Sequence, residues 1–205
     1  MKAKVSSALS LFAEKGDYQS LEILFESGVS LNVTNDKGQP GLHIGARHGH
    51  LDVVKLYLNR GIDINTTEQN GYIALHRASG YGHEQVARYL LEQGSDPNRQ
   101  GQPNKWTPIS LAARYGHLEI LKMLHQTGGS LHRSTSKGWS PLMLAARGKH
   151  PLIVEYLLSH GVDSSLKNHR RLTAMDIALK NKEQAIIEML SASCLLYTSP
   201  SPRDS

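Results

Sequence analysis

The residues of this chain best suited to chemistry are its eleven histidines and one cysteine, which commonly serve as zinc ligands or in thiol catalysis. The histidines recur instead of clustering. Two of them, His43 and His76, share one place in a recurring pattern. Four others share a second place, at spacings of 33, 34 and 33 residues: His50, His83, His117 and His150. Copies related by a fixed spacing fall in separate layers of a repeat structure, so we interpret them as structural and predict no metal site.

The remaining chemical motifs are weak. His48-Gly49-His50 has only Asp52 as a nearby carboxylate, which is too few ligands for a convincing metal site. The sequence contains no Gly-x-Ser-x-Gly nucleophile motif and no phosphate-binding loop. Cys194 lies near the end of the chain, outside the recurring pattern, so a Cys-His enzyme within the pattern is excluded. We therefore predict no catalytic residues, no bound metal and no cofactor.

Four stretches carry the recurring histidines and share one pattern. They read GLHIGARHGHLDVVKLYL (41–58), GYIALHRASGYGHEQVARYLL (71–91), WTPISLAARYGHLEILKML (106–124) and GWSPLMLAARGKHPLIVEYLL (138–158). Each has a first helix with paired small residues, then in most copies a Gly suited to a left-handed helix end, and then an apolar second helix. Thr107-Pro108 and Ser140-Pro141 are helix-start signals. The period predicts a stack of helix–turn–helix units.

These stretches resemble the ankyrin repeat, whose pattern G-x-T-P-L-H-x-A-A-x-x-G-H is followed by an apolar second helix and a closing Gly. The resemblance covers roughly residues 4–190. It implies an all-α ankyrin solenoid of about six units with hairpin-like loops, at approximate boundaries 4–36, 37–69, 70–103, 104–136, 137–169 and 170–190. The family uses the imidazole at the position of His43 and His76 to hydrogen-bond the turn.

Both ends of the chain admit two interpretations. Residues 1–13 carry two lysines and a short apolar run, as a secretory signal does, but Leu9 lies 33 residues before Leu42, so we favour a first repeat helix. Residues 173–190 turn polar, as a terminal capping unit requires. Residues 191–205 break the period. We predict that they form a disordered tail, either translated adaptor sequence or a natural segment with kinase-like sites at Ser199 and Ser201.

Composition sets further limits. The chain has no run of 18 apolar residues, so no membrane-spanning helix is expected. A single cysteine rules out an internal disulfide framework and fits an intracellular location, cytoplasmic or nuclear. The formal net charge of +5 and the pI of about 9.3 reflect either ordinary solubility or an acidic partner.

In ankyrin arrays the loop tips and the ends of the first helices line a concave face, so the resemblance implies a binding surface there. Both tryptophans share the loop position, and basic residues recur at the helix ends. The expected partner-binding residues are Arg47, His48, Tyr72, Tyr81, Trp106, Arg114, Tyr115, Trp139, Arg147 and Lys180. Trp, Tyr and Arg are enriched in interface hot spots. The alternative is that the arginines complement helix dipoles and the tryptophans only pack.

We expect a non-catalytic, monomeric scaffold or adaptor that binds another protein, with an acidic or amphipathic segment favoured, on this basic and aromatic face. An array that binds nucleic acid or nucleotide through the same residues is one alternative. It is disfavoured because the basic residues come one per repeat and not in a dense cluster. The other alternative is the regulatory ankyrin region of a longer enzyme or channel.

Overall fold

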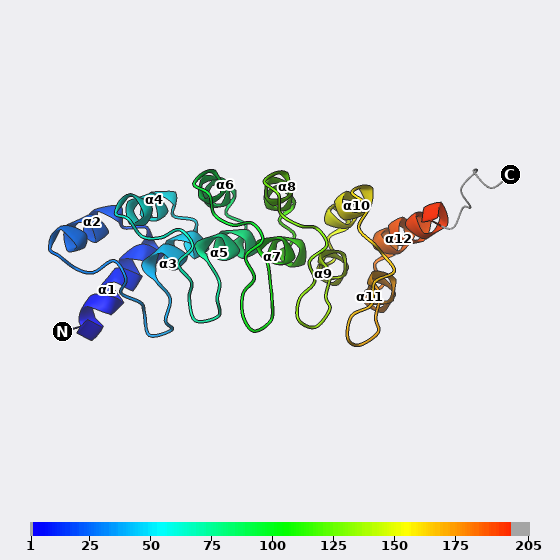
Figure 1. Cartoon of the computed structure of the whole chain (residues 1–205), viewed down its shortest axis with the longest axis horizontal. Helices are drawn as coiled ribbons and strands as arrows, with labels where there is room; N and C mark the ends of the chain where they lie inside the picture. The colour runs from blue at the N-terminus through cyan, green and yellow to red at the C-terminus, as the bar shows by residue number, and fades with distance from the viewer. Residues whose placement is uncertain (1, 198–205) are drawn as a thin grey trace.

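The computed structural model describes residues 2–197, with side chains described for residues 5–193. The elements in this range are helices, and they come in six pairs (Figure 1). In chain order they are α1 (Lys2–Lys15), α2 (Tyr18–Glu26), α3 (Gly41–His48), α4 (Leu51–Asn59), α5 (Ala74–Tyr81), α6 (Glu84–Glu92), α7 (Pro108–Tyr115), α8 (Leu118–Gln126), α9 (Pro141–Gly148), α10 (Pro151–Ser159), α11 (Ala174–Asn181) and α12 (Gln184–Tyr197). The predicted all-α solenoid is confirmed. None of the described helices is long and apolar enough to cross a membrane.

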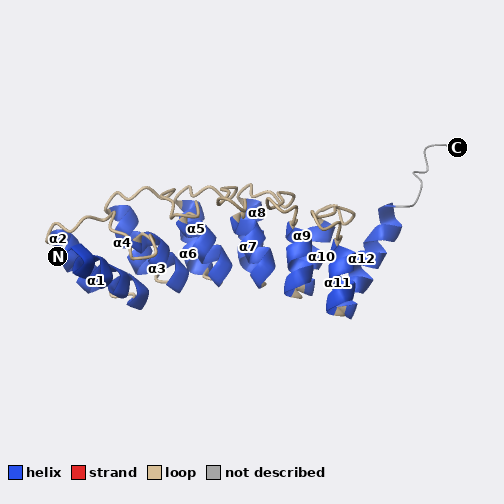
Figure 2. Ribbon diagram, turned by 90° about the horizontal axis from the view of Figure 1, so that it is seen from below, coloured by secondary structure: helices blue, strands red, loops and turns tan. Residues whose placement is uncertain are grey.

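The helices lie in two rows. Figure 1 shows the first helix of each pair in one row and the second helix in the other, with long loops projecting beyond the first-helix row. In Figure 2 these loops run along one edge of the stack. The first helices of neighbouring pairs pack together more extensively than the second helices do. We call the surface formed by the loops and the C-terminal ends of the first helices the loop face.

The core lies between the two rows and continues from pair to pair. Leu42, Leu75 and Ile109 of the first helices are fully buried, as are Val54 and Leu121 of the second helices. Because each pair buries its apolar side against its neighbours, the stack needs no single central core.

The first helices differ in how they begin. The Thr107 hydroxyl accepts the Ser110 N–H at 3.1 Å, and the Ser140 hydroxyl accepts the Met143 N–H at 3.3 Å, as the helix-start signals predict. Ile73 has no polar side chain to play this part. Instead, His76 Nδ1 accepts the Ile73 N–H at 3.2 Å, which satisfies a different backbone donor at the same helix end.

His43 and His76 also link their own helices, α3 and α5, to the loop that follows in the next repeat. The Nε2–H of His43 donates to the Tyr72 carbonyl at 2.9 Å, and that of His76 donates to the Trp106 carbonyl at 3.1 Å. This is the turn hydrogen bond that the resemblance implies. Both rings are buried, so burial lowers their pKa, in His76 from 6.5 to about 3.

A second link, the glycine–histidine contact, joins the end of each of the first helices α1, α3, α5 and α7 to the next pair. Gly116 ends α7 with φ of +90°, and a Cβ added there would lie 2.6 Å from His150 Cε1. The His150 Nε2–H donates to the Arg114 carbonyl at 3.2 Å. The same arrangement recurs at three earlier positions, with His50 over Gly16, His83 over Gly49 and His117 over Gly82.

The last pair replaces this contact with an ion pair. The helix-ending position of α9 is Lys149, with φ of +66°, and Glu183 stands where the earlier pairs have histidine. The Lys149 Nζ lies 2.9 Å from Glu183 Oε1. Where no imidazole covers the turn, the turn therefore contains a residue with a side chain.

The sequence-based prediction holds at the N-terminal end of the described chain but not at its C-terminal end. Helix α1 buries Leu9 and Ala13 in the continuous core, as the interpretation as a first repeat helix predicts. Helix α12 continues to Tyr197, whereas the sequence analysis expected disorder from residue 191. Residues 191–197 include Ala and Leu and no Gly or Pro, so nothing in them stops a helix. The rest of the expected tail, including Ser199 and Ser201, lies outside the described residues.

The glycine–histidine contact yields a prediction about two glycines of equal backbone geometry. Gly116 and Gly128 have φ of +90° and +91°, but nothing lies within 4 Å of a Cβ added at Gly128. Gly128→Ala should cost about 1 kcal/mol of unfolding free energy from backbone strain alone. Gly116→Ala should cost about 2–3 kcal/mol, because the methyl group also displaces the His150 ring. Urea denaturation of both variants measures the difference, and equal losses would show that the ring moves at no cost.

The buried imidazole of His76 predicts acid sensitivity. Its pKa is about 3 in the folded chain and 6.5 ordinarily, so between these values the unfolded chain binds a proton that the folded chain does not. Stability should therefore fall as pH drops below 6.5, by up to about 1.4 kcal/mol per pH unit for one group. Unfolding free energies at pH 7, 6, 5 and 4 should fall less steeply in His76→Gln, whatever its stability at pH 7. An unchanged slope would exclude His76 as a source of the sensitivity.

Candidate functional site

The ten residues expected to bind a partner all lie on the loop face. Tyr72, Trp106 and Trp139 are in the loops that precede α5, α7 and α9. The other seven lie in the last turn of the first helices α3, α5, α7, α9 and α11: Arg47, His48, Tyr81, Arg114, Tyr115, Arg147 and Lys180. Tyr81 and Tyr115 are 47% and 56% exposed, while both tryptophans are partly buried against the core.

The arginines and the aromatic rings of this face are paired. The Arg147 guanidinium carbon lies 4.9 Å from the centre of the Trp139 ring, and that of Arg47 lies 5.0 Å from the centre of the Tyr81 ring. The Arg47–Tyr81 pair joins neighbouring repeats. A guanidinium within about 6 Å of an aromatic ring is attracted to its face. Each of these two cations is thus held near an aromatic ring.

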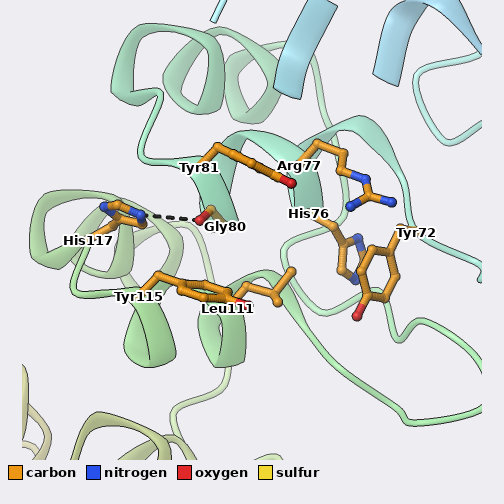
Figure 3. Close-up of a pocket in the computed structure, with 8 residues that line it drawn as sticks. All are labelled: Tyr72, His76, Arg77, Gly80, Tyr81, Leu111, Tyr115 and His117. Atoms are coloured by element: carbon orange, nitrogen blue, oxygen red, sulfur yellow. Dashed lines mark hydrogen bonds between the residues drawn. The ribbon is translucent and has the colours of Figure 1, made fainter. Parts of the chain in front are cut away.

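A pocket of about 580 Å³ lies between α5 and α7 on this face. Its lining brings together three of the expected residues, Tyr72, Tyr81 and Tyr115, with others that the sequence analysis did not select (Figure 3): His76, Arg77, Gly80, Leu111 and His117. The Tyr72 ring stacks on the His76 ring at 4.6 Å and an angle of 6°. Because that stack and the His76 hydrogen bonds fix both rings, one wall of the pocket is rigid.

The other expected residues lie outside this pocket. Trp139 and Arg147 form a separate pair one repeat further along, and Lys180 is exposed in the last pair. His48 Nε2 lies 3.8 Å from Glu14 Oε1, and its ring stacks on His50, so it is engaged with the preceding repeat. The expected surface is therefore one pocket with flanking positions, not a uniform stripe.

Arg77 is the main residue of the pocket that sequence reasoning missed. The equivalent residues of the neighbouring repeats, Ile44, Leu111 and Leu144, are buried aliphatic side chains. Arg77 instead forms an ion pair with Glu68, whose side chain is only 3% exposed, and its guanidinium lies 5.3 Å from the Tyr72 ring centre. Aligning the repeats of this sequence could have found Arg77, because it occupies a position that is aliphatic in the other repeats.

Glu68 also differs from the residues at the same loop position in other repeats. Its backbone N–H donates to the Tyr72 carbonyl, as the N–H of Asn168 donates to that of Leu172 in a later loop. Asn35 and Asn168 use their side-chain oxygens to accept the loop's own N–H groups. Glu68 instead directs its carboxylate to Arg77 and to the Gln39 side chain, 3.2 Å away. The pair therefore fixes the loop to α5.

At neutral pH the charge of this pocket comes from arginine. Burial lowers the pKa of His76 to about 3 and lowers the pKa of His117, so both imidazoles are neutral. Burial raises the pKa of Tyr72, so its hydroxyl stays protonated. The pocket can therefore offer apolar rings, tyrosine hydroxyls and guanidinium groups, which suit binding of a polar or acidic ligand.

A second cluster of titratable groups lies on the second helices. His125 Nδ1 is 2.9 Å from the Tyr156 hydroxyl, and the rings of His125 and His160 are 5.0 Å apart. Among the residues whose side chains are described, no group of three or more His, Cys, Asp or Glu has the arrangement of a metal site.

Helix pairs stacked in single file, with loops along one face, define a helical repeat solenoid. The chain belongs to the ankyrin-repeat family: residues 9–101 and 109–198 each match the family model described as ankyrin repeats (3 copies). The structure is similar to a chain of the complex between the predatory endopeptidase Bd0816 from Bdellovibrio bacteriovorus and the immunity protein Bd3460. The TM-score is 0.81 and the identity 26%, covering 91% of this chain and 98% of that chain. A search of curated proteins found no match.

The Glu68–Arg77 pair predicts a non-additive mutant cycle. Arg77→Leu installs the residue of neighbouring repeats but leaves the Glu68 carboxylate buried and unpaired, and should cost about 3 kcal/mol. The double variant Glu68→Asn/Arg77→Leu, with both residues taken from other repeats of this chain, should lie within about 1 kcal/mol of the wild type or be more stable. Urea denaturation measures both. A double variant as unstable as Arg77→Leu would attribute the loss to packing instead of an unpaired charge.

Proposed function

We propose that this chain is a non-catalytic protein-interaction module that binds an acidic or amphipathic segment of another protein on the loop face. The observation that supports this best is the pair of exposed tyrosines, Tyr81 and Tyr115, each with an arginine near its ring. Tyrosine and arginine are the residues that most often contribute large binding energies at interfaces. The lone Cys194 fits an intracellular location, as the sequence analysis expects.

The distribution of charge favours an acidic protein segment over a nucleic acid. The expected arginines and lysine come at most one per repeat, and Arg47, Arg114 and Arg147 each lie near an aromatic ring. A nucleic-acid site usually presents a denser basic surface, because its affinity depends on neutralising many phosphates. Among the described residues, no carboxylate lies within ion-pair distance of these three arginines. They remain available for carboxylates of a partner.

The similar structure adds support from outside the chain. That structure is a complex of an endopeptidase with an immunity protein, and the similarity extends over nearly the full length of both matched chains. A partner along an array of this length would meet several repeats at once. We therefore propose that binding extends from the pocket toward Trp106, Trp139 and Arg147, with the chain acting as a monomer.

The proposal predicts which charge reversal weakens binding. A partner recovered by affinity purification and then purified should bind Arg114→Glu at least about tenfold more weakly than the wild type at low salt, mainly through slower association. Trp139→Ala should mainly speed dissociation and cost about 2 kcal/mol of binding free energy. Surface plasmon resonance at low and high salt measures both rates. Circular dichroism checks that each variant is folded.

Arg88→Glu provides a matched control, because Arg88 is exposed on the second helix α6, away from the loop face. It makes the same charge change and should leave the affinity within about twofold of the wild type. Equal weakening by Arg88→Glu and Arg114→Glu would mean that net charge alone drives binding. A recovered partner that proves to be nucleic acid would contradict the proposal.

A further inference from the structure

The third helix pair departs from the others at the position that opens the pocket. The residue two before the helix-ending position is Glu14 in the first repeat and basic in four others, at Arg47, Arg114, Arg147 and Lys180, but here it is Gly80. The Gly80 backbone does not require glycine, since its φ is not positive. A Cβ added there would lie 3.6 Å from Leu111 Cβ, at ordinary contact distance. A side chain at Gly80 would therefore extend over Leu111 and occupy the pocket.

The space left by Gly80 is bounded by aromatic rings. Tyr81 and Tyr115 occupy the same position in successive repeats, and in Figure 3 Tyr81 lies on one side of the pocket while Tyr115 and Leu111 lie on the other. Tyr72 closes a third side. Among the exposed large apolar side chains of the described residues, Tyr81 and Tyr115 are the aromatic ones. Aromatic rings pair well with another ring, stacked or edge to face.

Positive charge surrounds these rings and is only partly neutralised. The guanidinium carbons of Arg47, Arg77 and Arg114 lie 5.0, 5.3 and 5.9 Å from the centres of tyrosine rings of the pocket. Of these three arginines, only Arg77 forms an ion pair with Glu68. The Arg47 Nε is buried and has no hydrogen-bond partner. Among the described residues, neither Arg47 nor Arg114 has a carboxylate within ion-pair distance, so both can meet carboxylates of a partner beside the ring-lined pocket.

We propose that this pocket is the anchor site for one aromatic side chain of the partner, carried in an acidic segment with carboxylates on both sides of it. The proposal rests on the proposed function and specifies the chemistry that the partner inserts. The volume of about 580 Å³ lies within the range of ligand pockets and holds an aromatic side chain with its adjoining backbone. The aromatic ring lies between Tyr81 and Tyr115, and the flanking carboxylates meet Arg47 and Arg114.

The test uses a defined probe, the peptide acetyl-Asp-Glu-Phe-Glu-Asp-amide, titrated into the isotopically labelled 205-residue chain and followed by NMR. We expect saturable shifts centred on Gly80, Tyr81, Leu111 and Tyr115, with a dissociation constant of about 1 mM or tighter. The peptide with Ala in place of Phe should bind at least about tenfold more weakly. Equal binding of the two peptides, shifts centred elsewhere, or no saturable shift up to about 5 mM would overturn the proposal.

Two variants make the test specific to the pocket. Gly80→Leu fills the space without backbone strain and should reduce peptide affinity at least about tenfold, while Gln93→Leu, exposed at the end of α6, should not change it. Melting curves establish that both variants are folded. If a purified partner is sensitive to Arg114→Glu but indifferent to Gly80→Leu, the pocket proposal fails while the proposed function stands. If neither substitution matters, both fail.

Discussion

The arrangement of this solenoid depends on the glycine–histidine contact between successive helix pairs. A helix end leaves backbone carbonyls without partners, and a turn with positive φ favours glycine, which has no side chain to fill the space beside it. Here one imidazole from the next pair meets both needs. Its ring fills the space above the glycine, and its Nε2–H donates to a carbonyl of the helix end, as His150 does over Gly116. At the end of α9 the histidine is replaced by Glu183, and the glycine is replaced by Lys149, so the two residues of the contact are lost together.

Because these contacts fix one pair on the next, the positions just before each glycine are free to vary. The carbonyls of Glu14, Arg47, Gly80 and Arg114 accept the imidazole protons through the backbone, so their side chains play no part in that bond. The residues at the ends of the first helices therefore vary without loss of the stack. This is the physical reason why the loop face can differ between repeats while the rows of helices stay the same.

The sequence was sufficient for the parts of the structure that repeat. The period, the helix-ending glycines and the caps at Thr107 and Ser140 follow from local chemistry that recurs in register. The turn hydrogen bonds of His43 and His76 came instead from the resemblance to the ankyrin repeat. The sequence was insufficient where a repeat has a different residue type from the other repeats at the same position. Arg77 looks like an ordinary surface cation until the fold shows that its position is buried elsewhere, and the pocket at Gly80 arises from a missing side chain. The helical continuation to Tyr197 was missed because periodicity does not detect a helix that simply fails to stop.

Glu68, Arg77 and Gly80 are best understood together. A buried ion pair contributes little net stability compared with apolar residues of similar volume, so stability gives no reason for Glu68 and Arg77 to replace the asparagine and leucine found in other repeats. Their geometry does have a consequence for the surface: the pair holds the Tyr72 loop against α5 and places a guanidinium over the Tyr72 ring. With Gly80 leaving the adjoining space open, the three departures combine into one rigid, ring-lined pocket. The proposed binding role would give all three departures one explanation, which the small net stability of a buried ion pair does not.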